Sequence, residues 1–227
     1  MIFFDIDGTL LDYDYAEQEG ILDFFRAHNH YFSFTEQQSI DLWKQLSKEY
    51  FEKFLANELA FHEQKRLRMI NIFKIAEIDL SDQEADEKFK MYLSFYKKNW
   101  KVYKDVIETL DQLKQRGYTL GVISNGDYEQ QIEKLQRMGI KDYFNCVITS
   151  SEIGVAKPDK SIFEEACARV KRQIKDCYYV GDRLDTDALG SNMAGMKGIW
   201  LNRTDNKQEH PDIMIIKSLQ ELSKVIT

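Results

Sequence analysis

From about Tyr103 to the end of the chain, short apolar segments alternate with helical ones, and this alternation constrains the fold more than any other feature. Strands are expected at residues 118–124, 146–149, 177–182, 199–201 and 213–216. Helices are expected at residues 105–116 and 128–138, then one that follows Pro158 and a last one that ends near Ala194. Buried strands joined by helices form parallel sheets with right-handed crossovers and helices on both faces. We therefore predict an α/β fold with a doubly wound parallel sheet.

A stretch of different character separates the first expected strand, residues 2–6, from the others. Residues 14–100 contain no proline, a single glycine (Gly20) and many apolar residues at helical spacing, with Thr35 and Ser81 as expected N-caps. We predict a core of residues 1–13 and 101–227 and an inserted helical cap of residues 14–100. Open α/β sheets bind ligands at the carboxyl ends of their strands, so a cap inserted there is expected to act as a lid, with hinges at residues 13–14 and 100–103.

Composition excludes several classes of partner. The 227 residues carry a net charge of -7, and the basic residues are dispersed rather than clustered, which disfavours binding to a nucleic-acid polymer. No apolar run approaches the roughly 20 residues of a membrane span. The apolar opening segment is interrupted by Asp5 and Asp7 and lacks a cationic leader. We expect no membrane partner and a monomer or weak homodimer.

The cysteines indicate the compartment. Cys146, Cys167 and Cys177 are odd in number and form neither a CxxC pair nor a metal-ligand spacing. Reduced, packed thiols of this kind are typical of cytosolic proteins. We expect a cytoplasmic location.

The sequence Asp5-Ile6-Asp7-Gly8-Thr9 at the end of the first strand is the strongest chemical signal. Two carboxylates at a strand end are suited to Mg²⁺, which prefers oxygen ligands. One carboxylate can attack phosphorus, and the other can give a proton to the leaving alcohol and later take one from water. Gly8 would let the backbone approach a phosphate, and Thr9 would support the turn.

Three weaker motifs follow at the ends of later strands. Ser124-Asn125-Gly126 offers a hydroxyl and backbone N–H groups to a phosphate, although the same tripeptide is a common turn. Lys157 could hold a phosphoryl charge, although a lysine before a proline is usually solvated. Asp182 could complete a metal site, with Asp187 orienting water or pairing with Lys157. Because parallel strands end at one edge of a sheet, all four motifs are expected to converge there.

This order of motifs resembles the haloacid dehalogenase superfamily, with a helical cap of the first type and an overall layout similar to the pyrimidine 5′-nucleotidase-like branch. The resemblance implies that Asp5 is the nucleophile and a Mg²⁺ ligand, and that Asp7 is the general acid and base with its backbone carbonyl on the metal. The remaining implied roles are phosphate binding by Ser124, Asn125, Gly126 and Lys157, metal binding by Asp182, and support of the site by Asp187 and Thr9.

The expected function is a Mg²⁺-dependent phosphatase of small phosphorylated metabolites, including nucleoside 5′-monophosphates. A sugar-phosphate phosphatase, a phosphomutase, a phosphonate hydrolase and a non-catalytic binding protein of the same fold stay open, whereas Asp7 argues against a dehalogenase. Tyr13, Trp43 and Arg66 are candidate substrate contacts in the cap, although cap core or solvated surface is the role that we favour for each. Arg183 either contacts substrate or forms a salt bridge, and we favour the salt bridge.

Overall fold

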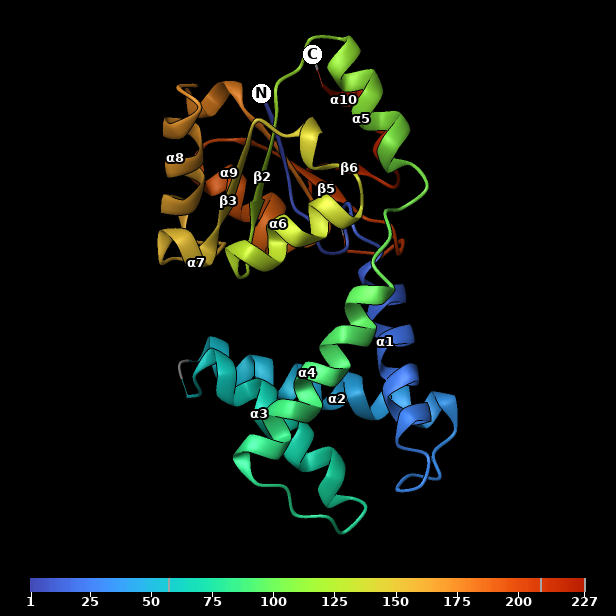
Figure 1. Ribbon diagram of the computed structural model, residues 1–227. Helices are drawn as coiled ribbons and strands as arrows, with labels where there is room; N and C mark the ends of the chain where they lie inside the picture. Colours follow the sequence, from blue (N-terminus) through green and yellow to red (C-terminus); the bar gives the residue numbers. More distant parts are fainter. Residues whose placement is uncertain (57, 209, 227) are drawn as a thin grey trace. The chain divides into compact units, whose positions relative to one another are not determined.

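The computed structural model describes residues 1–56, 58–208 and 210–226, and divides the chain into two compact units (Figure 1). Met1–Tyr13 together with Trp100–Thr227 forms the first, which we call the core unit. Asp14–Asn99 forms the second, which we call the helical unit.

A six-stranded parallel sheet organises the core unit, with the strand order β3-β2-β1-β4-β5-β6. Its strands are β1 Ile2–Phe4, β2 Leu120–Ser124, β3 Cys146–Thr149, β4 Tyr178–Gly181, β5 Lys197–Leu201 and β6 Met214–Ile216. The predicted doubly wound parallel sheet is confirmed. The sheet places β1 in its middle, hydrogen-bonded to β2 on one side and β4 on the other.

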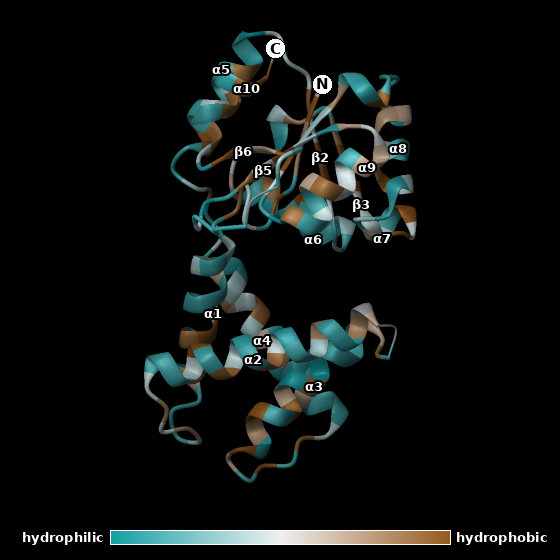
Figure 2. Ribbon diagram, turned by 180° about the vertical axis from the view of Figure 1, so that it is seen from behind, coloured by the Kyte–Doolittle hydropathy of each residue, from teal (hydrophilic) through white to brown (hydrophobic). Residues whose placement is uncertain are grey.

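Helices pack around this sheet (Figure 1). They are α5 Val106–Gln115, α6 Tyr128–Arg137, α7 Ser150–Ile153, α8 Lys160–Arg169, α9 Gly190–Ala194 and α10 Leu222–Val225, with 3₁₀ turns at Lys141–Tyr143, Ile174–Asp176 and Leu219–Glu221. On one face of the sheet, Phe3 and Tyr179 share a buried cluster with Phe163 of α8, whose ring meets that of Tyr179 edge to face at 5.3 Å. Figure 2 shows the strands as the more hydrophobic layer and the surrounding helices as the more hydrophilic one.

The register of the three central strands brings their ends to one edge. Phe4 of β1 lies opposite both Val122 and Val180, and the N–H of Asp5 donates to the Val180 carbonyl at 2.9 Å. Because the strands are parallel, the residues that follow these positions leave the sheet together. This register explains how segments more than 100 residues apart in sequence contribute to one site.

The chain after β4 departs from the regular helix that the sequence predicts up to Ala194. Leu184–Leu189 form a π-helix, and only Gly190–Ala194 form α9. The Ala188 N–H donates to the Arg183 carbonyl five residues earlier at 3.2 Å, and the Asp187 N–H donates to the same oxygen at 3.1 Å. Such wide turns are common at functional sites, and this one carries Asp187 into the interior, where it is 1% exposed.

Among its described residues, the helical unit has four helices: α1 Tyr13–Ala27, α2 Glu36–Leu55, α3 Phe61–Lys74 and α4 Asp82–Lys98. The predicted N-caps are confirmed, since Thr35 and Ser81 each form a capping box with the residue three positions on. No helix among the described residues is long and apolar enough to cross a membrane.

A close approach inside the helical unit depends on Gly20. A Cβ atom at this position would lie 2.8 Å from the Tyr96 Cα atom of α4, which is backbone and cannot rotate away. Glycine in a helix otherwise costs roughly 0.5–1 kcal/mol relative to alanine. The close packing of α1 on α4 therefore explains why glycine is present there.

We predict that Gly20→Ala lowers the free energy of unfolding by about 1–3 kcal/mol, because the added methyl overpacks the contact with Tyr96. Urea denaturation measures this change. Ser94→Ala, at an exposed position of α4, is the control and should leave stability within about 0.5 kcal/mol. A gain in stability for Gly20→Ala would mean that helix propensity outweighs the contact.

Candidate active site

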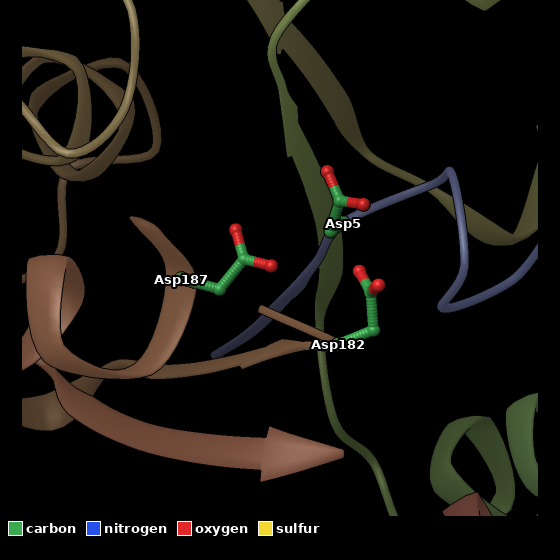
Figure 3. A group of neighbouring side chains, drawn as sticks. All are labelled: Asp5, Asp182 and Asp187. Atoms are coloured by element: carbon green, nitrogen blue, oxygen red, sulfur yellow. The ribbon is translucent and has the colours of Figure 1, made fainter. Parts of the chain in front are cut away.

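Three carboxylates meet at the carboxyl edge of the sheet. Asp5 directly follows β1, Asp182 directly follows β4, and Asp187 comes from the π-helix, and Figure 3 shows their side chains turned toward one another. Each offers an oxygen, and the three oxygens lie within 4.8 Å of one another. Two ends of parallel strands and one widened helical turn thus build a compact acidic site.

A buried lysine holds two of these carboxylates. Lys157 Nζ donates to Asp5 Oδ1, to Asp187 Oδ1 and to the Tyr179 hydroxyl, each at 2.7 Å. Tyr179 in turn donates to the Ile123 carbonyl at 2.7 Å. An ammonium has three protons, so these contacts use its full donor capacity and fix its place beside Asp5.

Burial and charge shift the acid strengths of these groups. Desolvation raises the pKa of Asp5 to about 6, with Lys157 opposing the rise and Asp187 adding to it. Desolvation, followed by repulsion from Asp5, raises the pKa of Asp182 to about 8. Burial disfavours the Lys157 ammonium, but Asp187 and Asp5 outweigh this and raise its pKa.

The charge balance of the site is suited to a divalent cation. If ionised, Asp5, Asp182 and Asp187 carry three negative charges against the single positive charge of Lys157, so the buried site has an excess of two. Uncompensated buried charge is costly, and raised carboxyl pKa values are one sign of it. Carboxylate oxygens are the ligands that Mg²⁺ prefers. Asp5 and Asp182 are the residues that would hold Mg²⁺. Both oxygens of Asp187 already accept hydrogen bonds, Oδ1 from Lys157 and Oδ2 from the Arg183 N–H, whereas Lys157 contacts Asp5 through Oδ1.

The turn after β1 packs directly on Asp182. Gly8 has a positive φ of 82°, and a Cβ atom there would lie 2.5 Å from Asp182 Oδ2. The Thr9 hydroxyl is 3.5 Å from Asp182 Oδ1, and its side chain is buried. Gly8 is therefore needed for its backbone shape and for the room that it leaves to Asp182.

Asp7 lies beside this cluster and has different partners. Lys134 Nζ on α6 contacts Asp7 Oδ1 at 2.6 Å and Oδ2 at 2.7 Å. Gln131 Nε2, one turn earlier, donates to Asp7 Oδ2 at 3.3 Å and to Ser124 Oγ at 3.0 Å. The structure thus links the expected acid and base to the expected phosphate-binding hydroxyl.

The segment Ser124-Asn125-Gly126 is held by contacts within the protein. The Asn125 side chain donates to the Lys157 carbonyl at 3.0 Å and accepts from the Lys157 N–H at 2.8 Å. The Gly126 N–H donates to Ser150 Oγ at 2.9 Å. Asn125 therefore joins this segment to the backbone at Lys157. The Asn125 side chain and the Gly126 N–H already have hydrogen-bond partners within the protein.

Four further candidates came from the sequence, namely Arg183, Tyr13, Trp43 and Arg66. Arg183 is exposed and its Nε atom is 3.6 Å from Asp185 Oδ1, which is the salt bridge that the sequence analysis favoured. Tyr13 is the first residue of α1, in the core unit, and is partly buried. The other two belong to the helical unit.

Trp43 and Arg66 already have partners in the helical unit. Trp43 is 1% exposed and donates to Glu17 at 3.1 Å, and its ring centroid lies 4.1 Å from that of Tyr92 with the two rings tilted by 44°. Arg66 makes two hydrogen bonds to Asp86, at 2.9 and 2.7 Å. Both side chains are therefore engaged in contacts within the helical unit rather than available to a substrate.

Sequence reasoning missed Tyr179, Gln131 and Lys134. Tyr179 lies within an apolar strand, where a tyrosine is an ordinary β-sheet residue. Gln131 and Lys134 occur in a helix rich in polar residues, and nothing in the spacing distinguishes them from its exposed face. Only the packing of α6 shows that both side chains are buried.

Comparison with known proteins decides the family. Residues 1–195 match the family model of the haloacid dehalogenase-like hydrolases. The chain belongs to this family. Its fold is shared by the HAD-hydrolase YfnB from Bacillus subtilis, whose structure bound to magnesium superimposes with a TM-score of 0.84 at 22% identity, covering 100% of this chain and 97% of that one.

Two curated members of the family resemble the chain in sequence. Glyceraldehyde 3-phosphate phosphatase of Methanopyrus kandleri is 44% identical over 111 residues, 49% of this chain and 48% of that protein. N-acylneuraminate-9-phosphatase of Rattus norvegicus is 27% identical over 210 residues, 89% of this chain and 82% of that protein. The aligned part of the chain thus spans about half the length of the first relative and most of the second.

The raised pKa values give a test of the metal site that needs no substrate. A carboxyl with a higher pKa in the folded than in the unfolded chain keeps its proton longer when folded, so stability falls as pH rises between the two values. For Asp182 that window runs from its ordinary 3.8 to about 8. We predict that the protein without added metal loses stability across this window, and that Mg²⁺ raises Tm more at pH 8 than at pH 5.

The Asp182→Asn variant tests whether Asp182 causes this loss of stability and binds the added Mg²⁺. This variant should raise Tm at pH 8 without added metal, because it removes a desolvated charge, and it should abolish most of the shift caused by Mg²⁺. Asp185→Asn is the matched control, since the Asp185 side chain is 71% exposed. A Mg²⁺ shift of equal size at both pH values, or one that survives in Asp182→Asn, would contradict the assigned site.

Proposed function

We propose that this protein is a Mg²⁺-dependent phosphatase of small phosphorylated metabolites that transfers the phosphoryl group to Asp5. The observation that carries the proposal is the buried Asp5 carboxylate, bound to Lys157 and faced by Asp182 and Asp187. A carboxylate held in place beside an ammonium, in a largely dry site, is suited to attack on phosphorus. When bound, Mg²⁺ supplies positive charge that stabilises the phosphoryl oxygens.

The first half of the reaction forms an aspartyl-phosphate. An Asp5 oxygen attacks phosphorus, the bond from phosphorus to the ester oxygen breaks, and that oxygen takes a proton from Asp7 as the alcohol leaves. Lys157 neutralises Asp5 and the phosphoryl charge, and Ser124 donates its hydroxyl proton to a phosphoryl oxygen. Phosphoryl transfer requires little beyond this positioning and charge stabilisation.

The second half returns Asp5 to its carboxylate form. Water attacks the phosphorus of the aspartyl-phosphate while Asp7, now ionised, accepts a proton from that water. The bond between phosphorus and Asp5 breaks and inorganic phosphate forms. Asp7 thus regains the proton that it gave to the alcohol, and the cycle closes without any other reactant.

For the substrate class we propose phosphate esters of sugars and sugar acids, ahead of nucleotides. The two curated relatives are named for glyceraldehyde 3-phosphate and for N-acylneuraminate 9-phosphate. Trp43, the ring that the sequence offered as a candidate substrate contact, is 1% exposed and buried in the helical unit, so it does not present a face to a nucleobase. In this proposal the core unit supplies the chemistry.

Hydrolysis of p-nitrophenyl phosphate tests the activity. We predict turnover that depends on Mg²⁺ and is lost on exhaustive chelation. Asp5→Asn should abolish it at nearly unchanged side-chain volume, and circular dichroism should show the fold intact. Asp185→Asn, at the exposed end of the same edge, should retain normal turnover. Full activity after chelation would refute the metal requirement, and no activity at all would support a non-catalytic binding protein.

Lys157→Met tests the buried cation. We expect kcat to fall by at least about 100-fold, because the ammonium stabilises charge in a site that excludes most water. Lys160→Met, at a lysine whose side chain is 71% exposed on α8, is the control. A change in kcat within about threefold for Lys157→Met would show that the lysine contributes nothing specific to the reaction.

A substrate panel tests the proposed class. With Mg²⁺ present, sugar and sugar-acid phosphates should give a kcat/KM at least about ten times that of nucleoside 5′-monophosphates. The reverse order would favour the nucleotidase expected from the sequence. Isomerisation of a sugar phosphate without release of phosphate would instead identify a phosphomutase.

A further inference from the structure

We infer that Gln131 and Lys134 of α6 are positioning residues that hold Asp7 and Ser124 in a fixed relation to each other. This inference rests on the proposed phosphatase reaction, in which Asp7 moves protons and Ser124 binds the phosphoryl group. It concerns two residues outside the four motifs, and it assigns to α6 a role in the protonation of the leaving alcohol.

Lys134 is buried far more deeply than the carboxylate that it binds. Its side chain is 4% exposed, compared with 28% for Asp7, and its Nζ atom lies within 2.7 Å of both carboxylate oxygens. A lysine is seldom buried without a compensating partner, because its ammonium loses hydration. Contact with both oxygens restricts rotation of the carboxylate, so Lys134 determines where the acid group of Asp7 points.

Gln131 connects the same carboxylate to the phosphate-binding hydroxyl. Its amide nitrogen donates to Asp7 Oδ2 at 3.3 Å and to Ser124 Oγ at 3.0 Å. Since Ser124 Oγ accepts this hydrogen bond, its own proton is available for another acceptor, such as a phosphoryl oxygen. When Asp7 is ionised, both of its oxygens only accept hydrogen bonds, so the amide nitrogen of Gln131, rather than its amide oxygen, is the atom that can bind to it.

The buried amide also has an unsatisfied atom. Gln131 is 1% exposed, and its Oε1 atom has no hydrogen-bond partner among the described residues. A buried acceptor without a partner destabilises a fold, so packing alone would favour an apolar residue here. This cost indicates that Gln131 is present for its two donated hydrogen bonds.

The start of α6 fixes the pair relative to the phosphate-binding segment. Asp127 caps the helix by accepting from the Gln130 N–H at 3.0 Å, only three residues after Ser124. Gln131 and Lys134 are three residues apart and therefore lie on the same face of the helix. The short helix α6 thus sets the position of Ser124 because it begins three residues after it in the chain. It sets the position of Asp7 by the hydrogen bonds of the Gln131 and Lys134 side chains.

If Lys134 positions Asp7, replacing Lys134 should lower kcat/KM by an amount that depends on the leaving group of the ester. p-Nitrophenolate leaves without a proton, whereas an alkoxide needs the proton of Asp7. The kinetic constant kcat/KM reports the steps up to release of the alcohol or phenol. Misplacing Asp7 should therefore lower kcat/KM for alkyl esters selectively, and slow the later attack of water on the aspartyl-phosphate for both kinds of ester.

The experiment compares Lys134→Met with Lys160→Met on two substrates, p-nitrophenyl phosphate and the best sugar phosphate of the panel. We expect Lys134→Met to lower kcat/KM for the sugar phosphate by about 100-fold and for the aryl ester by no more than about threefold. With the aryl ester, kcat should fall and a burst of p-nitrophenolate should appear, because water attack becomes limiting. Lys134→Arg, which keeps the charge and the fold, should show the same selectivity to a smaller extent.

Gln131→Met adds an independent readout. It should raise Tm by a few degrees, because the unsatisfied acceptor is removed, while lowering kcat/KM for both esters by about tenfold through the loss of order at Ser124. Gln136→Met, at an exposed position of α6, is its control and should change neither quantity.

The outcomes separate this inference from the proposed function. If the wild-type protein hydrolyses neither ester with Mg²⁺, both fail. If it hydrolyses both and Lys134→Met or Lys134→Arg lowers the two kcat/KM values equally, the positioning role fails and the phosphatase assignment stands. Unchanged kcat/KM values in Gln131→Met would likewise remove Gln131 from the assignment.

Discussion

The ammonium of Lys157 is the contact on which the rest of the site depends. It brings together the end of β1, the π-helix and a tyrosine from β4 by its bonds to Asp5, Asp187 and Tyr179. A buried ion pair of this kind adds little net stability over an apolar cluster of similar size, but removing one member is costly. The site is therefore arranged around a charge that the fold must keep neutralised, and its acidic excess is what makes a divalent cation a suitable ligand.

Much of the fold and of the candidate site could be predicted from the sequence, because both depend on local sequence patterns and on the geometry of parallel sheets. The strand ending at Asp5 and the strand ending before Asp182 are apolar runs, and parallel pairing brings their ends to one edge. The pairing of Lys157 with Asp187 was one of two roles expected for Asp187. Thr35 and Ser81 were recognisable as caps because the capping box is a local sequence pattern.

The remainder depends on tertiary packing that one sequence does not reveal. The π-helix at Leu184–Leu189 differs from an α-helix by one residue in a turn, and no composition rule marks it. Lys134 resembles any surface lysine until the helix is packed against Asp7. Trp43 and Arg66 are of types that often bind ligands, yet their partners in the helical unit already occupy them.

The central place of β1 has a consequence for how the chain folds. Its neighbours β2 and β4 begin at Leu120 and Tyr178, so β1 has no partner strand in this sheet until more than 100 further residues have been made. The helices of residues 14–99 are complete well before that point. Long-range strand pairing is slow because it closes a large loop, and an unpaired apolar strand is open to wrong contacts. The strand that leads to Asp5 is therefore expected to be among the last to be secured, and the acidic site forms only as the whole sheet closes around it.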